Sequence, residues 1–194
     1  MSRAWTALFV VLAWAGAAAA QTQSAAPTTD AGTQLAFPAA LGGAQFVRSV
    51  NYAAPPANNP GMGHSYFYST PKKMVIVVQV YNGGRRVPPG MDNPAVISEF
   101  ANELAASEQQ AQFAGYTQFE RPSVSSTCAY GSARFRCISY SAATQANARL
   151  YTKVLVTSYR DHFVKIRIEW WPSRQQTAAD AEAALQAFVP ALMH

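Results

Sequence analysis

The two cysteines of the chain, Cys128 and Cys137, bound the segment CAYGSARFRC and are the first candidates for chemistry. Redox pairs usually lie two residues apart at the start of a helix, and two thiolates alone leave a zinc ion short of ligands. If residues 131–134 form a four-residue hairpin loop, Cys128 lies directly opposite Cys137. Such cross-strand partners are about 4.5 to 5.5 Å apart, which a disulfide can span. We therefore predict a structural disulfide.

Histidines are the other side chains that could drive a reaction, and the chain has three, His64, His162 and His194. A hydrolytic triad needs a nucleophile, a base and an orienting acid, yet the sequence has neither a G-x-S-x-G nor an S-x-x-K motif. His64 precedes Ser65, but neighbours on a strand point in opposite directions. His162 follows Asp161 at an expected hairpin tip, where aspartate serves the turn. We assign no catalytic residue, and the sequence favours a non-catalytic protein.

Soft ligands could make a copper site in the Gly/Pro-rich loops, because exported proteins bind copper with thioether and imidazole groups. Met62, His64 and Met91 could supply three ligands if their loops meet. The alternative is that both methionines pack over the edge of the sheet. Glu99 and Glu103 lie one helical turn apart, which is typical of a solvated helix face. With no phosphate-binding or dinucleotide-binding glycine motif, we expect no cofactor.

The N-terminus predicts export. A basic start at Arg3, an apolar stretch and small residues up to Ala20 form the pattern of a signal peptide over residues 1–20. The apolar stretch is weaker than the roughly 20 strongly apolar residues of a membrane anchor, and no cysteine stands near the cleavage point for lipid attachment. We expect a periplasmic or secreted protein with no membrane span in the mature chain, a flexible linker over residues 21–36, and one domain over residues 37–194.

Residue periodicity predicts an α+β domain. Apolar patterns indicate strands over residues 46–52, 65–69, 74–81, 116–120, 150–159 and 163–171, besides the cysteine hairpin. Helices are expected from residue 94 to 115 and from 177 to 192, the second kinked or ended near Ala187 by Pro190. The apolar run from Met74 to Val78 is typical of a central strand. Short turns between the strands favour a mainly antiparallel sheet packed by two helices.

The last predicted strand has two different faces. Ile166 and Ile168 fall on one side, and Lys165 and Arg167 on the other, with one indole of Trp170–Trp171 on each side. The Lys165 face could be a partner surface, since aromatic residues and arginine are enriched in interfaces. We favour the alternative that the terminal helix covers it. The net charge of +5 is spread without a dense basic run, so nucleic acid is not an expected partner.

In layout the chain resembles the PsbP-like α/β/α sandwiches and small exported bacterial proteins of that type. The features that carry the resemblance are Phe37–Pro38 before the first strand, the hairpin centred on residues 159–167, and the closing helix. The resemblance implies a binding or assembly module, because members of that fold are commonly non-enzymatic accessory proteins.

These observations predict an exported, non-catalytic binding or accessory protein whose partner is another protein or an envelope component. The alternative is a copper-handling or hydrolytic protein with a site around His64. The two hypotheses predict different distances between His64 and the nearest second polar group. A site places a second ligand or base within reach of His64, whereas the binding module predicts no convergent polar cluster there.

Overall fold

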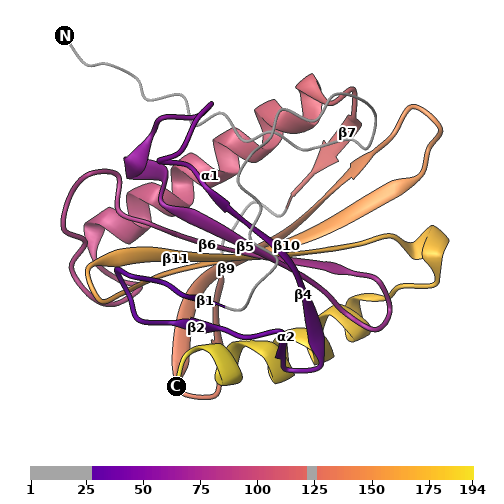
Figure 1. Ribbon diagram of the computed structural model, residues 1–194. Coiled ribbons are helices and arrows are strands. Elements are labelled where there is room, and N and C mark those ends of the chain that lie inside the picture. The colour runs from indigo at the N-terminus through magenta and orange to yellow at the C-terminus, as the bar shows by residue number, and fades with distance from the viewer. Residues whose placement is uncertain (1–27, 122–125) are drawn as a thin grey trace, which may run out of the picture.

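One large antiparallel sheet forms the central layer of the molecule (Figure 1). The computed structural model describes residues 28–121 and 126–194. The strands are β1 (Thr28–Thr29), β2 (Ala36–Phe37), β3 (Ala40–Leu41), β4 (Ala44–Asn51), β5 (His64–Ser69), β6 (Val75–Tyr81), β7 (Thr117–Glu120), β8 (Ser126–Tyr130), β9 (Ala133–Ala143), β10 (Arg149–Tyr159) and β11 (His162–Trp170). The large sheet has the order β3-β4-β5-β6-β11-β10-β9-β7, and β8 also pairs with β9.

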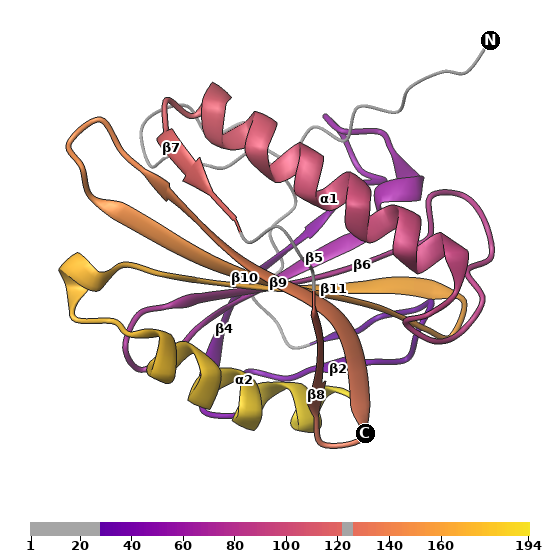
Figure 2. The ribbon, with the colours of Figure 1, turned by 180° about the vertical axis from the view of Figure 1, so that it is seen from behind.

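Two helices cover opposite faces of this sheet, so the molecule has three layers (Figures 1 and 2). Helix α1 (Pro94–Phe113) begins at Asn93, whose side chain accepts a hydrogen bond from the backbone of Val96. Helix α2 (Ala178–Leu192) begins with a capping box between Thr177 and Asp180. The predicted α+β class, with a mainly antiparallel sheet packed by two helices, is confirmed. Neither helix, nor any other in the described residues, combines the length and apolar character that a membrane crossing needs.

The larger core lies between the sheet and α2. Strand β11 contributes Ile166 and Ile168 to it, while α2 contributes Leu185 and Phe188, and all four side chains are buried. Strand β6 lies between β5 and β11 and is buried along most of its length, as its apolar sequence predicts. Pro190 does not end α2 near Ala187, because it lies in the last turn of a helix that runs on to Leu192.

The opposite face of β11 packs under α1. The burial of charged side chains at this contact differs from the prediction of a solvated helix face. Lys165 and Glu103 are both buried, so Glu103 does not lie on a solvated helix face. Glu103 points into the protein because its carboxylate accepts a hydrogen bond from Lys165. The face around Lys165 is covered as expected, but α1 covers it in place of the terminal helix. Trp170 is the buried member of the tryptophan pair and lies on the α2 side.

The cysteine hairpin has a different register from the one predicted. Tyr130 pairs with Ala133, so the turn contains two residues, Gly131 and Ser132. Gly131 takes a positive φ of 60°, which glycine adopts without strain and which such tight turns require. Cys128 therefore lies opposite Phe135, and Cys137 lies opposite Ser126. The two cysteines are diagonal neighbours on one face of the hairpin.

The N-terminal segment is packed on the domain from residue 28, so the predicted linker over residues 21–36 is too long. Strands β1 and β2 pair in a small separate sheet, and Asp30, Thr33 and Leu35 between them are buried. Leu35 belongs to the core and Asp30 makes several hydrogen bonds, which hold the segment in place. The predicted signal peptide lies outside the described residues.

Candidate functional site

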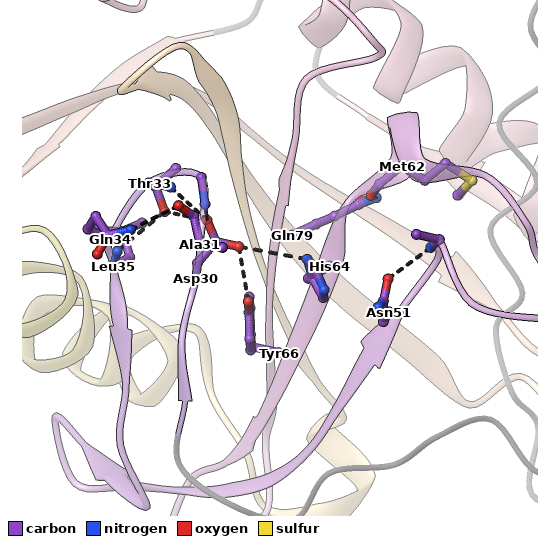
Figure 3. Close-up of polar contacts among 12 residues, drawn as sticks. Asp30, Ala31, Thr33, Gln34, Leu35, Asn51, Met62, His64, Tyr66 and Gln79 are labelled. Carbon is purple, nitrogen blue, oxygen red and sulfur yellow. Dashed lines mark hydrogen bonds and ion pairs between the residues drawn. The ribbon is translucent and has the colours of Figure 1, made fainter.

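Asp30 lies in the N-terminal segment, residues 28–37, and is the centre of a polar cluster between this segment and β5 (Figure 3). Its Oδ1 accepts hydrogen bonds from the backbone of Gly32 (3.1 Å) and Thr33 (2.8 Å) and from the Thr33 hydroxyl (2.8 Å). Its Oδ2 accepts a bond of 3.0 Å from the Tyr66 hydroxyl. Burial and the neighbouring Asp30 carboxylate raise the pKa of Tyr66 above its usual range. Tyr66 is therefore a neutral donor that fixes the buried carboxylate.

His64 lies beside this carboxylate at the start of β5. Its Nδ1 is 3.8 Å from Asp30 Oδ2, and 38% of its side chain is exposed, against 4% for Asp30. The Asp30 carboxylate therefore places a fixed negative charge beside this imidazole. Figure 3 shows the imidazole directed toward Asp30 and away from the loop that carries Met62.

A second imidazole lines the same cavity, which has a volume of about 160 Å³. His162 begins β11, and its Nδ1 is 2.8 Å from the backbone oxygen of Arg160. A carbonyl oxygen only accepts hydrogen bonds, so Nδ1 carries the proton. The other edge of the ring lies against Gly32, where a Cβ atom would be only 2.5 Å from Nε2. A side chain at position 32 would therefore require the His162 ring to move.

The segment is also attached to the tip of the β10–β11 hairpin. Arg160 donates a hydrogen bond of 3.1 Å from Nη1 to the backbone oxygen of Thr33. Next to it, Arg86 and Asp161 form an ion pair of 2.9 Å. The cavity is thus enclosed by the N-terminal segment, the start of β5 and the hairpin tip, three parts of the chain that are far apart in sequence.

The other predicted ligands are not part of this cluster. Figure 3 shows the sulfur of Met62 directed away from His64, and the Met62 backbone oxygen accepts a bond from Gln79. Met91 packs against the core under α1. Within the described part of the chain, no three His, Cys, Asp or Glu side chains are arranged to hold a metal ion. Ser65 points away from His64, and its hydroxyl bonds to Tyr52.

The cysteine pair forms a separate cluster beside α2. Both thiols are free in this structure, and the two residues approach each other to 2.6 Å. Ser126 Oγ lies 3.2 Å from Cys137 Sγ. Nearby, Lys153 and Tyr130 both donate to the carboxylate of Glu182. Although partial burial opposes it, these bonds lower the pKa of Glu182, which is therefore charged near neutral pH.

Sequence reasoning named His64 as a candidate, interpreted His162 as part of a hairpin tip, and missed Asp30, which it assigned to the linker. The local signal was present, because an aspartate followed by glycine and threonine is typical of a turn closed by its own side chain. Its long-range partners gave no signal, since Tyr66 lies 36 positions later in the chain.

Comparison with known proteins gives a similarity of fold alone. No family model and no curated protein matches the sequence. Among solved structures, the chain is similar to the solution structure of cyanobacterial PsbP (CyanoP) from Synechocystis sp. PCC 6803. The similarity covers 93% of this chain and 96% of that one, at 11% identity and a TM-score of 0.49. It agrees with the predicted resemblance in layout and carries no information about function.

Proposed function

We propose that the protein is an exported, non-catalytic binding or accessory protein, and that it contacts its ligand or partner at the cavity between Asp30, His64 and His162. Export is supported by the signal-peptide pattern of residues 1–20. One observation carries the binding site. Asp30 stands 3.8 Å from His64 in a cavity that His162 also lines. A binding module without a site here is expected to have no polar cluster at His64, so this arrangement agrees with the alternative hypothesis in placing a site there. The residues around the cluster are what favour binding over catalysis at that site.

Binding is favoured over hydrolysis by the residues around the imidazoles. Among the described residues that line the cavity, none has a serine, threonine or cysteine side chain. The nearest hydroxyl in sequence, that of Ser65, belongs to the other face of β5. Two imidazoles that line one cavity with a buried carboxylate offer hydrogen bonds and charge to a ligand, which is what recognition requires.

Native mass spectrometry of the protein purified from its native host tests this proposal. We expect the wild-type chain to retain a ligand or partner, and the double variant His64→Gln/His162→Gln to lose it. His194→Gln is the matched control, because it removes the third histidine at the exposed C-terminal residue. Equal retention by the double variant would place the contact elsewhere and contradict the proposed site.

Oxidation of the cysteine pair is a separate expected outcome of export. The exported chain should begin at Gln21 and have a mass lower by about two hydrogen atoms, restored on reduction. Because the closed loop is short, Cys128→Ser or Cys137→Ser should each lower the free energy of unfolding by only about 2 to 3 kcal/mol. Intact mass and urea unfolding measure both effects, with Ser126→Ala as a control that keeps both thiols. Free thiols in the exported chain would contradict this prediction.

A further inference from the structure

We infer that the cavity between His64 and His162 binds a carboxylate group, and that binding strengthens as the two imidazoles take up protons. The inference rests on the proposed function, since it names the ligand chemistry of the same site. It follows from which hydrogen-bonding groups are already occupied and which are left for a ligand.

The acceptor in the cavity is already occupied. Asp30 accepts four hydrogen bonds within the protein, three at Oδ1 and one at Oδ2, and Oδ2 also faces His64. Its side chain is only 4% exposed. The carboxylate therefore acts as a fixed charge that orients His64, and it has little surface for a ligand.

The groups that remain are donors when the imidazoles are protonated. In the described part of the chain, Nε2 of His64 makes no hydrogen bond, whereas His162 is fixed through Nδ1 and its Nε2 edge lies against Gly32. Asn82 also lines the cavity, and its Oδ1 accepts a bond from Gly84, which leaves its NH₂ group. Donors from His64 and Asn82, next to a second imidazole that adds positive charge when protonated, recognise an anionic acceptor, and hydrogen bonds between charged partners are the strongest.

Charge at the site depends on pH through these two side chains. Histidine is the side chain that ordinarily changes charge between pH 5 and 8. The charged groups that face the pair are Asp30 from the N-terminal segment, Arg160 at the hairpin tip, and Asp161, which is paired with Arg86. Tyr66 is neutral. Protonation of both imidazoles exceeds the single charge of Asp30, so the cavity becomes net positive as the pH falls.

Size restricts the ligand to a small group. A volume of about 160 Å³ is below the roughly 300 to 1,000 Å³ of pockets for drug-sized ligands. It suits a carboxylate with a few attached carbon atoms. Such a group can come from a free small acid or from the carboxyl end of a peptide.

Amide NMR spectra of the full mature chain test the inference with succinate, a short peptide with a free carboxyl end, and the same peptide with an amidated end. At about pH 5.5, where histidine is largely protonated, succinate should shift the amide signals of Gly32, Gly63 and Asn82 in a saturable way. At about pH 8 its affinity should be at least roughly tenfold weaker. A peptide that binds only with a free end identifies that source, whereas succinate alone identifies a free acid.

Variants and an opposite charge complete the test. His64→Gln and His162→Gln should each weaken succinate binding about tenfold and flatten its pH dependence, while His194→Gln should change neither; unchanged spectra outside the cavity show that each variant is folded. Methylammonium is the probe of opposite charge. If methylammonium shifts the cavity amide signals and succinate does not, the cavity binds a ligand but the inference of a carboxylate ligand is wrong. If succinate shifts no cavity amide, the inference is wrong, and equal ligand retention by the double histidine variant separately contradicts the proposed function.

Discussion

Replacement of Glu103 by alanine is expected to lower the free energy of unfolding by about 3 to 5 kcal/mol, the range measured when one partner of a buried ion pair is removed. Glu103 Oε2 accepts a hydrogen bond of 2.7 Å from Lys165 Nζ, and both side chains are 6% exposed. The variant removes this carboxylate from the buried Lys165 ammonium, which lies beside the ring of Tyr81. Urea unfolding followed by far-UV circular dichroism measures the loss.

Two further variants show whether the buried charge is the cause. Glu108→Ala, on the same helix, removes a surface carboxylate whose partner Arg121 is 4.0 Å away, and it should cost less than about 1 kcal/mol. Replacing both buried partners, with Glu103→Leu and Lys165→Met, should recover most of the stability, since apolar residues of similar volume often substitute well for a buried pair. A loss below about 1 kcal/mol for Glu103→Ala would show that Lys165 finds another partner or reaches water.

Asp30→Ala is the second change with a large expected effect. It removes the acceptor for four hydrogen bonds and leaves the buried Tyr66 hydroxyl and the Thr33 donors unpaired. Each unsatisfied buried donor costs about 1 to 3 kcal/mol, so the three donors predict a loss of about 3 kcal/mol or more. The loss should be local, because the segment from Thr28 to Phe37 depends on these bonds. Hydrogen exchange should show faster exchange over this segment while strands β6 and β11 keep their protection.

Asp30→Asn is the matched control, because an amide oxygen still accepts the bonds from Gly32 and Thr33 while the charge beside His64 is lost. It should exchange more slowly over residues 28–37 than the alanine variant. Asp92→Ala, at an exposed position before α1, should leave exchange there unchanged. Equal protection of residues 28–37 in wild type and Asp30→Ala would show that Leu35 and Phe37 hold the segment without the carboxylate.

Much of the fold could be predicted because its signals are local. The alternation along β11 follows directly from one face buried under α2, and the Thr177–Asp180 pair marks the start of α2 within four residues. The cysteine hairpin shows where local reasoning stops. A two-residue and a four-residue loop both fit the sequence. The four-residue loop would place Cys137 opposite Cys128, whereas the two-residue loop of the structure places Phe135 there.

The parts that could not be predicted depend on contacts between distant residues. Glu103 looks like a solvated residue in its helix until Lys165, 62 positions later, is placed beneath it. Asp30 follows a polar stretch that resembles a linker, and only the position of His64 and Tyr66 on β5 shows that it belongs to a site. Polar residues carry no periodic burial signal, so their pairing in the interior cannot be read from spacing alone.

The attachment of the N-terminal segment to the β10–β11 hairpin also bears on the order of folding. The hydrogen bond from Arg160 to Thr33 joins residues 127 positions apart. Contacts of such separation require closure of a long loop, whose entropic cost is met only after the intervening chain is organised. The cavity is therefore expected to be among the last features to form, and an intermediate with a complete sheet would not yet bind. Ligand binding by this protein would then report completion of folding, and a bound ligand would slow the first step of unfolding.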